Sequence, residues 1–260
     1  MTDIQLQAFT VPSPLNGEAI AGYRLPGAAP GLLLCGVFSQ QSPLAKMLGR
    51  LVFSHARARG QDCVALDFRG QGRSAGEPWG MTLPGMVSDL LAIADHLKLE
   101  GRIGIGASLG AWTMLAAQQQ QPRLLRGMIA LAPAFDWDRT YFAPRRADGR
   151  LQALANGKLA EPGAAFMISP AFLETAEEYR LRSDGILLSD GLEVLHGTAD
   201  ETASFEHAAV VVRALGQHMQ ASLQPVPDED HSLSALTSPQ AQQLFVQRCD
   251  ALLQRCGVAI

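Results

Sequence analysis

Ser108 is the residue whose type and surroundings point most clearly to chemistry. It is the central residue of GASLG at positions 106–110, which fits the pattern G-x-S-x-G. The preceding residues 103–105 are apolar, as in a short buried strand, and residues 111–117 have the composition of a helix. A serine on such a sharp strand-to-helix turn is presented for nucleophilic attack, and the N–H groups at the helix start point toward its oxygen. The stretch predicts a nucleophile at Ser108, with a turn that has no chemistry as the alternative.

A nucleophilic serine needs a base, because its hydroxyl group is a poor nucleophile at neutral pH. His231 lies in a polar stretch, residues 228–232, between a predicted last strand and a predicted last helix. A loop side chain there can reach the edge of a sheet, so we predict His231 as the base. His196 ends a predicted strand before a turn glycine, and we expect it to support that loop. The other four histidines fall in stretches that we predict to be helical: His55, His96, His207 and His218.

The imidazole of such a base needs a carboxylate that fixes its tautomer. Asp200 follows the strand that ends at His196, and loops that leave the carboxyl ends of parallel strands converge on one site. Asp136, after the preceding strand, is the alternative acid, whereas the acidic residues at 228–230 are expected to be solvated. With Asp200 the chain order is Ser, Asp, His, the order found in the hydrolases that carry a G-x-S-x-G turn.

Two backbone N–H groups are expected to hold the oxyanion that forms when an acyl carbonyl is attacked. Leu109 follows the nucleophile directly, and the second donor comes from the loop after the apolar run 32–36. We predict Val37 as that donor, with Phe38 as the near alternative. If neither acts in this way, Val37 and Phe38 simply continue the strand.

These residues require a framework of alternating strands and helices. Such alternation is typical of a parallel sheet with helices on both faces, and the first two strands would form an antiparallel edge. Residues 133–186 interrupt the rhythm with many aromatic residues and no clear strands, which indicates a lid or cap. We therefore predict a core of residues 1–133 and 187–260 and a cap of residues 134–186. The predicted strands are 4–9, 19–25, 31–36, 63–67, 103–105, 127–131, 192–196 and 221–225, and the predicted helices outside the Ser108 turn are 42–59, 81–98, 204–215 and 239–255.

Composition narrows the class of protein. The 260 residues are 47% hydrophobic and 18% charged, which fits one compact domain, and the net charge of −4 gives no electrostatic basis for binding nucleic acid. No apolar run approaches the length of a membrane span, and the N-terminus lacks the features of a signal peptide. We therefore expect a cytoplasmic protein. The four cysteines have neither disulfide nor zinc spacing, so we expect buried spectators and no metal, although Cys35 sits beside the predicted site.

The sequence resembles the serine α/β-hydrolase family over nearly its full length, especially the branch of acyl-protein (palmitoyl) thioesterases and bacterial esterases. The resemblance lies in five segments: 35–39, 67–76, 106–112, 196–200 and 230–231. It implies Ser108 as nucleophile, Asp200 as acid, His231 as base, and a mostly parallel eight-stranded sheet with a small helical cap. The chain departs from that branch at Gly110-Ala111, at Glu201-Thr202-Ala203 and across the cap, which leaves the triad intact and puts substrate choice in doubt.

Together these observations predict a serine esterase or thioesterase that needs no cofactor and acts on a small acyl ester or thioester. The apolar cap favours a medium-length acyl or aromatic substrate, with Phe38, Trp137 and Phe142 lining the pocket. An acyltransferase, an amidase or peptidase, or a non-catalytic ligand-binding protein of the same fold are the alternatives. Arg145, Arg146 and Arg150 are expected to be solvated rather than to bind an anionic group. The sequence leaves a homodimer open.

Overall fold

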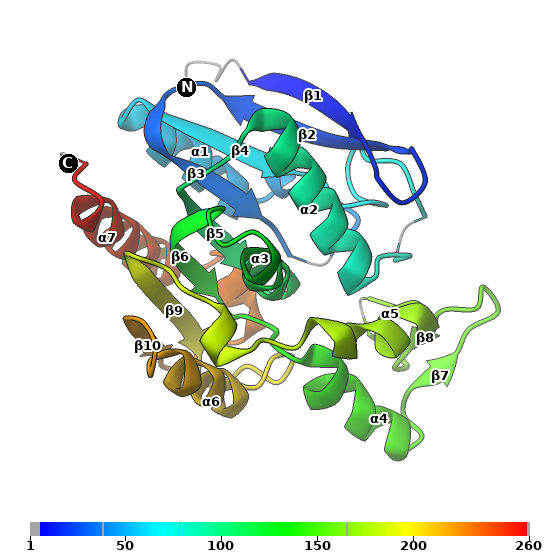
Figure 1. Ribbon diagram of the computed structural model, residues 1–260. Helices are drawn as coiled ribbons and strands as arrows, with labels where there is room; N and C mark the ends of the chain where they lie inside the picture. Colours follow the sequence, from blue (N-terminus) through cyan, green and yellow to red (C-terminus); the bar gives the residue numbers. More distant parts are fainter. Residues whose placement is uncertain (1–5, 38, 78, 165, 259–260) are drawn as a thin grey trace.

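The computed structural model describes residues 6–37, 39–77, 79–164 and 166–258, which include an eight-stranded sheet (Figure 1). The strand order is β1-β2-β4-β3-β5-β6-β9-β10. Strand β2 pairs antiparallel with β1 and with β4, and the other pairings in this sheet are parallel. This confirms the predicted mostly parallel, eight-stranded fold class with an antiparallel edge. The strands are β1 (Gln7–Pro12), β2 (Ala19–Leu25), β3 (Ala28–Cys35), β4 (Gln61–Leu66), β5 (Arg102–Ala107), β6 (Leu125–Leu131), β9 (Gly191–Gly197) and β10 (Ala221–Val226).

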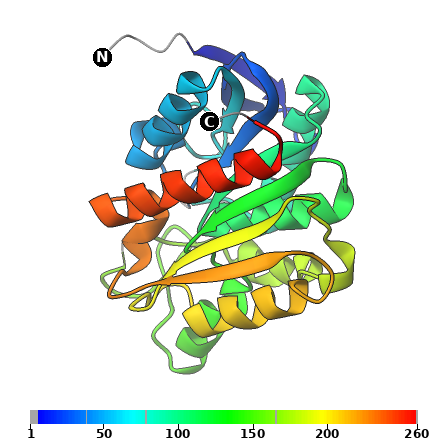
Figure 2. The same cartoon turned by 90° about the vertical axis from the view of Figure 1, so that its left-hand side faces the viewer.

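Helices cover both faces of the sheet, which explains why its central strands read as continuous apolar runs. In β3, Leu32 and Leu34 belong to the apolar cluster on one face, and Leu33 and Cys35 belong to the cluster on the other. Helices α1 and α7 cover the first face, whereas α2, α3 and α6 cover the second (Figure 1). Figure 2 looks onto the first face, where α7 crosses the strands. These helices are α1 (Met47–Ala58), α2 (Leu83–Leu97), α3 (Leu109–Gln120), α6 (Phe205–Leu215) and α7 (Pro239–Arg255).

Several helix boundaries follow from local capping chemistry. At α7, the Ser238 hydroxyl accepts a hydrogen bond from the N–H of Ala241, and Pro239 occupies the first helical position. At α2, the Thr82 hydroxyl caps the N–H of Gly85 in the same way. Helix α7 has the predicted bounds, and α2 is shorter than predicted by two residues at its start and one at its end.

The segment 134–186 lies beside α2 and α6 and is built from short elements (Figure 1). Its apolar side chains gather around Trp137, whose ring centroid lies 4.6 Å from that of Phe142 and 5.1 Å from that of Phe166. Trp137 and Phe142 belong to the same buried cluster as the α2 and α3 side chains. The division into core and cap domains stays a prediction. The elements are a π-helical turn (Asp138–Phe142), α4 (Ala143–Ala147), the strands β7 (Gln152–Ala153) and β8 (Leu159–Ala160), α5 (Pro170–Thr175) and two 3₁₀ turns (Ala176–Tyr179 and Ser183–Gly185).

Three sequence expectations are wrong in detail. The segment expected to lack strands contains the short antiparallel β7–β8 pair. The helix expected over 42–59 is divided into a 3₁₀ turn (Pro43–Ala45) and α1. His218 lies in the turn after α6, which ends at Leu215, so it is not helical. Within the described ranges, no helix combines the length and apolar character that crossing a membrane requires.

Candidate active site

Ser108 occupies the junction between β5 and α3, as its sequence context predicts. Its backbone has φ +53° and ψ −123°, a conformation that costs a non-glycine residue on the order of 1–3 kcal/mol. Two backbone hydrogen bonds hold Ser108 against β6 and the loop that follows β6. The N–H of Ser108 donates to the Leu131 carbonyl at 2.9 Å, and the N–H of Ala134 donates to the Ser108 carbonyl at 3.2 Å. The surrounding sheet therefore holds the strained turn in place.

The glycines on either side of Ser108 are required by close approach of the backbone. A Cβ atom on Gly106 would lie 2.7 Å from the Cα atom of Ala111. A Cβ atom on Gly110 would lie 2.5 Å from the carbonyl oxygens of Cys35 and Gly36. The start of α3 thus rests directly against the loop that follows β3.

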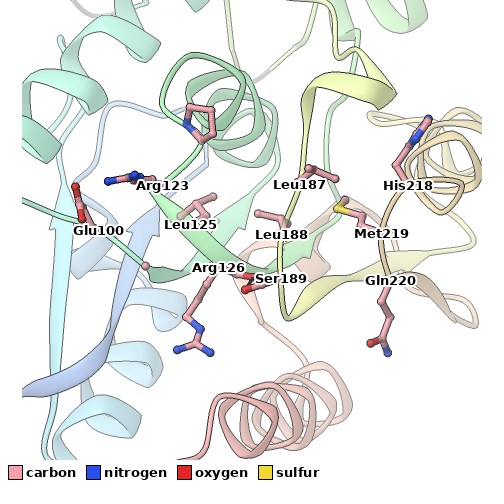
Figure 3. Close-up of a pocket in the computed structure, with 12 residues that line it drawn as sticks. Glu100, Arg123, Leu125, Arg126, Leu187, Leu188, Ser189, His218, Met219 and Gln220 are labelled. Carbon is pink, nitrogen blue, oxygen red and sulfur yellow. Dashed lines mark hydrogen bonds between the residues drawn. The ribbon is translucent and has the colours of Figure 1, made fainter.

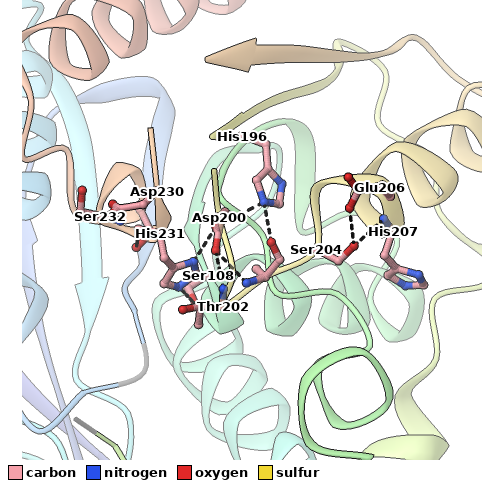
Figure 4. Close-up of polar contacts among 12 residues, drawn as sticks. Ser108, His196, Asp200, Thr202, Ser204, Glu206, His207, Asp230, His231 and Ser232 are labelled. Atoms are coloured by element: carbon pink, nitrogen blue, oxygen red, sulfur yellow. Dashed lines mark hydrogen bonds and ion pairs between the residues drawn. The ribbon is translucent and has the colours of Figure 1, made fainter. Parts of the chain in front are cut away.

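Ser108, His231 and Asp200 form one chain of hydrogen bonds (Figure 4). The Oγ atom of Ser108 lies 3.0 Å from Nε2 of His231, and Nδ1 of His231 lies 2.8 Å from Oδ2 of Asp200. An ionised carboxylate only accepts hydrogen bonds, so Nδ1 carries the proton and Nε2 is free to accept the Ser108 hydroxyl proton. The loops after β5, β9 and β10 bring the three residues to the same edge of the sheet.

The carboxylate of Asp200 is buried and surrounded by donors. Its Oδ1 atom accepts hydrogen bonds from the N–H groups of Thr202 at 2.9 Å and Ala203 at 2.8 Å. Burial by itself would raise the pKa of this carboxyl group. Hydrogen bonds from His196, His231 and the Ala203 N–H outweigh that effect and hold the pKa well below its usual range. Asp200 is therefore ionised at neutral pH.

His196 contacts Asp200 directly, which goes beyond the expected support of the loop. Its Nε2 atom lies 3.1 Å from the Ala203 carbonyl oxygen and 3.3 Å from Oδ2 of Asp200. Both of these atoms are acceptors, so Nε2 carries a proton. Within the described part of the chain, the buried Nδ1 atom has no hydrogen-bond partner. The side chain is fully buried. Its spacing of four residues from Asp200 was the available sequence signal.

Asp136, the alternative acid, lies in a different set of contacts. Its carboxylate is 2.9 Å from Nε2 of His207 on α6 and 3.0 Å from the guanidinium group of Arg180. These partners lower the pKa of Asp136 despite the opposing effect of burial. The structure brings Asp200, rather than Asp136, to His231.

The two predicted oxyanion donors lie on elements that touch each other. Leu109 is the first residue of α3, so its N–H has no acceptor within the helix. Val37 follows β3 in the loop whose Gly36 carbonyl meets Gly110. Phe38, the alternative donor and a predicted pocket residue, lies outside the described residues. The oxyanion roles stay predictions.

Comparison with known proteins agrees with this architecture. The family model described as "Serine aminopeptidase, S33" matches residues 50–160. The sequence is 25% identical over 248 residues to the human palmitoyl-protein thioesterase ABHD10, mitochondrial, and the match covers 93% of this chain and 78% of that protein. A protein from Agrobacterium vitis S4 superposes with a TM-score of 0.76 at 22% identity, over 96% of this chain and 99% of that one. The chain has the α/β-hydrolase fold.

A second solved structure, the mouse α/β-hydrolase domain-containing protein 10, superposes on this chain with a TM-score of 0.74 at 20% identity. That match covers 97% of this chain and 99% of the mouse one. At these identities the structural similarity establishes the fold, and the activity has to be argued from the site.

The two described aromatic residues that we predict to line a substrate pocket are almost fully buried. Trp137 is 2% exposed and Phe142 is 1% exposed. The indole N–H of Trp137 donates a hydrogen bond to the Thr202 carbonyl at 2.8 Å, which links the 134–186 segment to the loop that carries Asp200. Their role in a substrate pocket stays a prediction.

The arginines of the same segment have acidic neighbours. Arg145 pairs with Glu161 at 2.8 Å and lies over the ring of Tyr141, and Arg150 pairs with both Asp148 and Glu161. Arg146 is exposed. Arg150 is exposed as well, whereas Arg145 is half-buried, so the expectation of solvated arginines fits Arg146 and Arg150 only.

None of the cysteine side chains takes part in the described hydrogen bonds of Ser108, His231 or Asp200, although Cys35 is paired with Gly106 in the sheet. Cys35, Cys63 and Cys249 are buried free thiols, and burial raises the pKa of each. Cys256 is half-buried, and its pKa is raised to about 11, mainly by burial. Their thiol form at neutral pH fits the expected spectator role. Among the described residues, no group of three or more His, Cys, Asp or Glu side chains is placed to hold a metal ion.

A separate groove of about 830 Å³ lies at the amino ends of the parallel strands, opposite the end where Ser108 lies (Figure 3). Its lining comes from the residues just before β5, β6, β9 and β10, at the amino ends of these strands. Ser108 follows the carboxyl end of β5, so this groove is not the pocket of the hydrogen-bonded chain.

Proposed function

We propose that this α/β-hydrolase is a serine esterase or thioesterase that works through an acyl-enzyme intermediate. The observation that carries the proposal is the continuous hydrogen-bonded chain from the Ser108 hydroxyl through His231 to Asp200. A serine with a positive φ at the start of a helix, next to an imidazole held by an ionised carboxylate, has the parts that acyl transfer needs.

In the proposed reaction, Ser108 Oγ attacks the acyl carbonyl carbon while its proton passes to Nε2 of His231. The carbonyl π electrons move to its oxygen, which the N–H groups of Leu109 and Val37 stabilise. Asp200 stabilises the imidazolium without taking its proton. When the tetrahedral intermediate collapses, the bond to the alcohol or thiol breaks, and the leaving group takes the proton from His231. Water then attacks the acyl-enzyme by the same route and releases the carboxylic acid and the free serine.

The similarity to a palmitoyl-protein thioesterase favours thioesters among the substrates to be tested. Purified protein should be assayed with p-nitrophenyl esters and acyl thioesters over a series of acyl chain lengths. A higher kcat/KM for thioesters than for esters of equal acyl length would identify a thioesterase.

The nucleophile is tested with Ser108→Ala. We expect this variant to lose labelling by a fluorophosphonate probe and to lose p-nitrophenyl ester turnover by several orders of magnitude, because the reacting oxygen is removed. Ser232→Ala is a matched control, since Ser232 is an exposed serine beside His231. Equal labelling of Ser108→Ala and the wild type would refute the assignment.

A peptidase is the second candidate, because the matching family model bears the description of a serine aminopeptidase. Aminoacyl p-nitroanilides test this directly. Turnover of these amides at a rate comparable with that of esters would favour the peptidase.

A further inference from the structure

Gln71 is a buried amide in the glycine-rich loop that follows β4. It is 1% exposed, and it does not touch Ser108, His231 or Asp200 in the described contacts. Strand β4 is the sheet neighbour of β3, so the loop after β4 lies next to the loop after β3. The Gly70-Gln71-Gly72 sequence resembles part of a phosphate-binding loop, but the Gln71 side chain forms hydrogen bonds to the backbone instead.

The amide of Gln71 joins the two loops. Its Oε1 atom accepts a hydrogen bond from the N–H of Phe68 at 3.2 Å, and its Nε2 atom donates to the Val37 carbonyl at 2.9 Å. The next residue adds a second link, because the N–H of Gly72 donates to the Gln40 carbonyl at 3.0 Å. The loop after β3 is therefore held at two carbonyls by consecutive residues of the loop after β4.

The opposite side of the same loop is fixed by α3. The carbonyls of Cys35 and Gly36 approach Gly110 so closely that no side chain fits there. Val37 comes directly after this contact and is held by Gln71 through its carbonyl. Its backbone orientation therefore depends on two supports, of which the Gln71 amide is the one made by a replaceable side chain.

We propose that Gln71 is a positioning residue for acyl transfer. It holds the peptide plane that follows Val37, while the Gly36 carbonyl against Gly110 holds the preceding plane, which carries the Val37 N–H; together they restrict rotation about Val37. The inference rests on the proposed function, because it matters only if Val37 stabilises an oxyanion. A displacement of about 1 Å at a reacting centre can cost a factor of about 100, and loss of an oxyanion donor costs about 10²–10³. Release of one of the two supports should cost less than loss of the donor, about tenfold to hundredfold.

The test compares Gln71→Met with Gln118→Met. Gln118 is also fully buried, and its amide donates to the carbonyls of Pro122, Leu125 and Leu187 at the far end of α3. Both substitutions remove a buried amide, so both should lower the melting temperature. Only Gln71→Met should change the chemistry.

Two readouts on the full chain separate positioning from stability. One is kcat/KM for p-nitrophenyl acetate, and the other is the inhibition constant of phenylboronic acid, which forms a tetrahedral adduct with a nucleophilic serine. For Gln71→Met we expect kcat/KM to fall about tenfold to hundredfold and boronate affinity to weaken by a comparable factor. Gln118→Met should retain the wild-type value of both. Gln71→His keeps one donor and one acceptor and should recover part of the loss.

The inference is overturned if folded Gln71→Met has wild-type kcat/KM and boronate affinity, or if Gln118→Met loses as much of both. If Gln71→Met does not fold, Gln71→Glu gives the answer, because it keeps the shape and the acceptor but loses the donor at neutral pH. Wild-type activity in folded Gln71→Glu would then overturn the inference. A wild type that neither turns over esters nor labels at Ser108 would instead refute the proposed function itself.

Discussion

Replacement of Gly110 by alanine should damage catalysis more than it damages stability. The added Cβ atom would lie 2.5 Å from two backbone carbonyl oxygens, whereas ordinary contacts begin near 3.4 Å. The start of α3 and the loop after β3 must therefore separate by about 0.9 Å (3.4 − 2.5), since neither oxygen belongs to a flexible side chain. This separation moves the Leu109 N–H away from Val37.

Two effects on stability oppose each other in Gly110→Ala. Alanine is better than glycine in a helix by about 1 kcal/mol, and overpacking a tight contact costs about 1–3 kcal/mol. The net loss is at most about 2 kcal/mol, which corresponds to a decrease in Tm of about 4–8 °C for a chain of this size. Misplacement by about 1 Å at the reacting groups costs about a hundredfold in rate, or about 2.7 kcal/mol. Activity is therefore the more sensitive measurement.

The assay for Gly110→Ala is kcat/KM on p-nitrophenyl acetate together with a thermal melt. Gly185→Ala is the matched control, because its Cβ atom would meet Gln119 Oε1 at an ordinary 3.5 Å. It should match the wild type in activity. Wild-type kcat/KM in a folded Gly110→Ala variant would refute the claim that this contact sets the geometry of the site.

Four further variants, at Asp200, His55 and His196, test the electrostatics and hydrogen bonding of buried groups. The pKa of Asp200 is lower in the folded chain than its value of 3.8 in the unfolded chain, so ionised Asp200 stabilises the fold above pH 3.8 and loses this effect as the pH falls through the folded pKa. The Tm difference between wild type and Asp200→Asn should therefore shrink below about pH 4. A Tm difference that stays constant with pH would contradict this. Burial first, and then Arg59, lowers the pKa of His55 to about 4 despite the opposing effect of Asp250, so the unfolded chain alone takes up this proton between pH 6.5 and 4. His55→Leu should remove up to about 3 kcal/mol of the acid destabilisation over that range, measured by urea unfolding, and an unchanged pH slope would count against it. His196→Leu removes the hydrogen bond from Nε2 to Asp200 and should lower kcat/KM by about tenfold. His196→Gln should lower it less, because its amide can donate in place of Nε2. Equal losses in the two variants would argue against a role for the His196–Asp200 hydrogen bond.

Much of the fold was predictable because its signals are local. The serine cap and proline that begin α7 lie next to each other in the chain, and the continuous apolar runs of β3 and β5 report burial on both faces. The 134–186 segment was harder to predict, because its short elements depend on packing around Trp137 rather than on their own periodicity. The β7–β8 pair has only two residues in each strand, too few for a pattern of alternation.

The sequence by itself determined which residues could do the chemistry and in what order they occur. Ser108, Asp200 and His231 were identifiable because each follows a predicted strand, and the carboxyl ends of parallel strands share one edge. The tertiary structure decided which carboxylate meets His231, since Asp136 is drawn to partners on α6 and at Arg180. It also decided the contact of His196 with Asp200 and that of Gln71 with the Val37 carbonyl. Such contacts join residues through the packing of neighbouring strands and loops, and a linear pattern contains no measure of that distance.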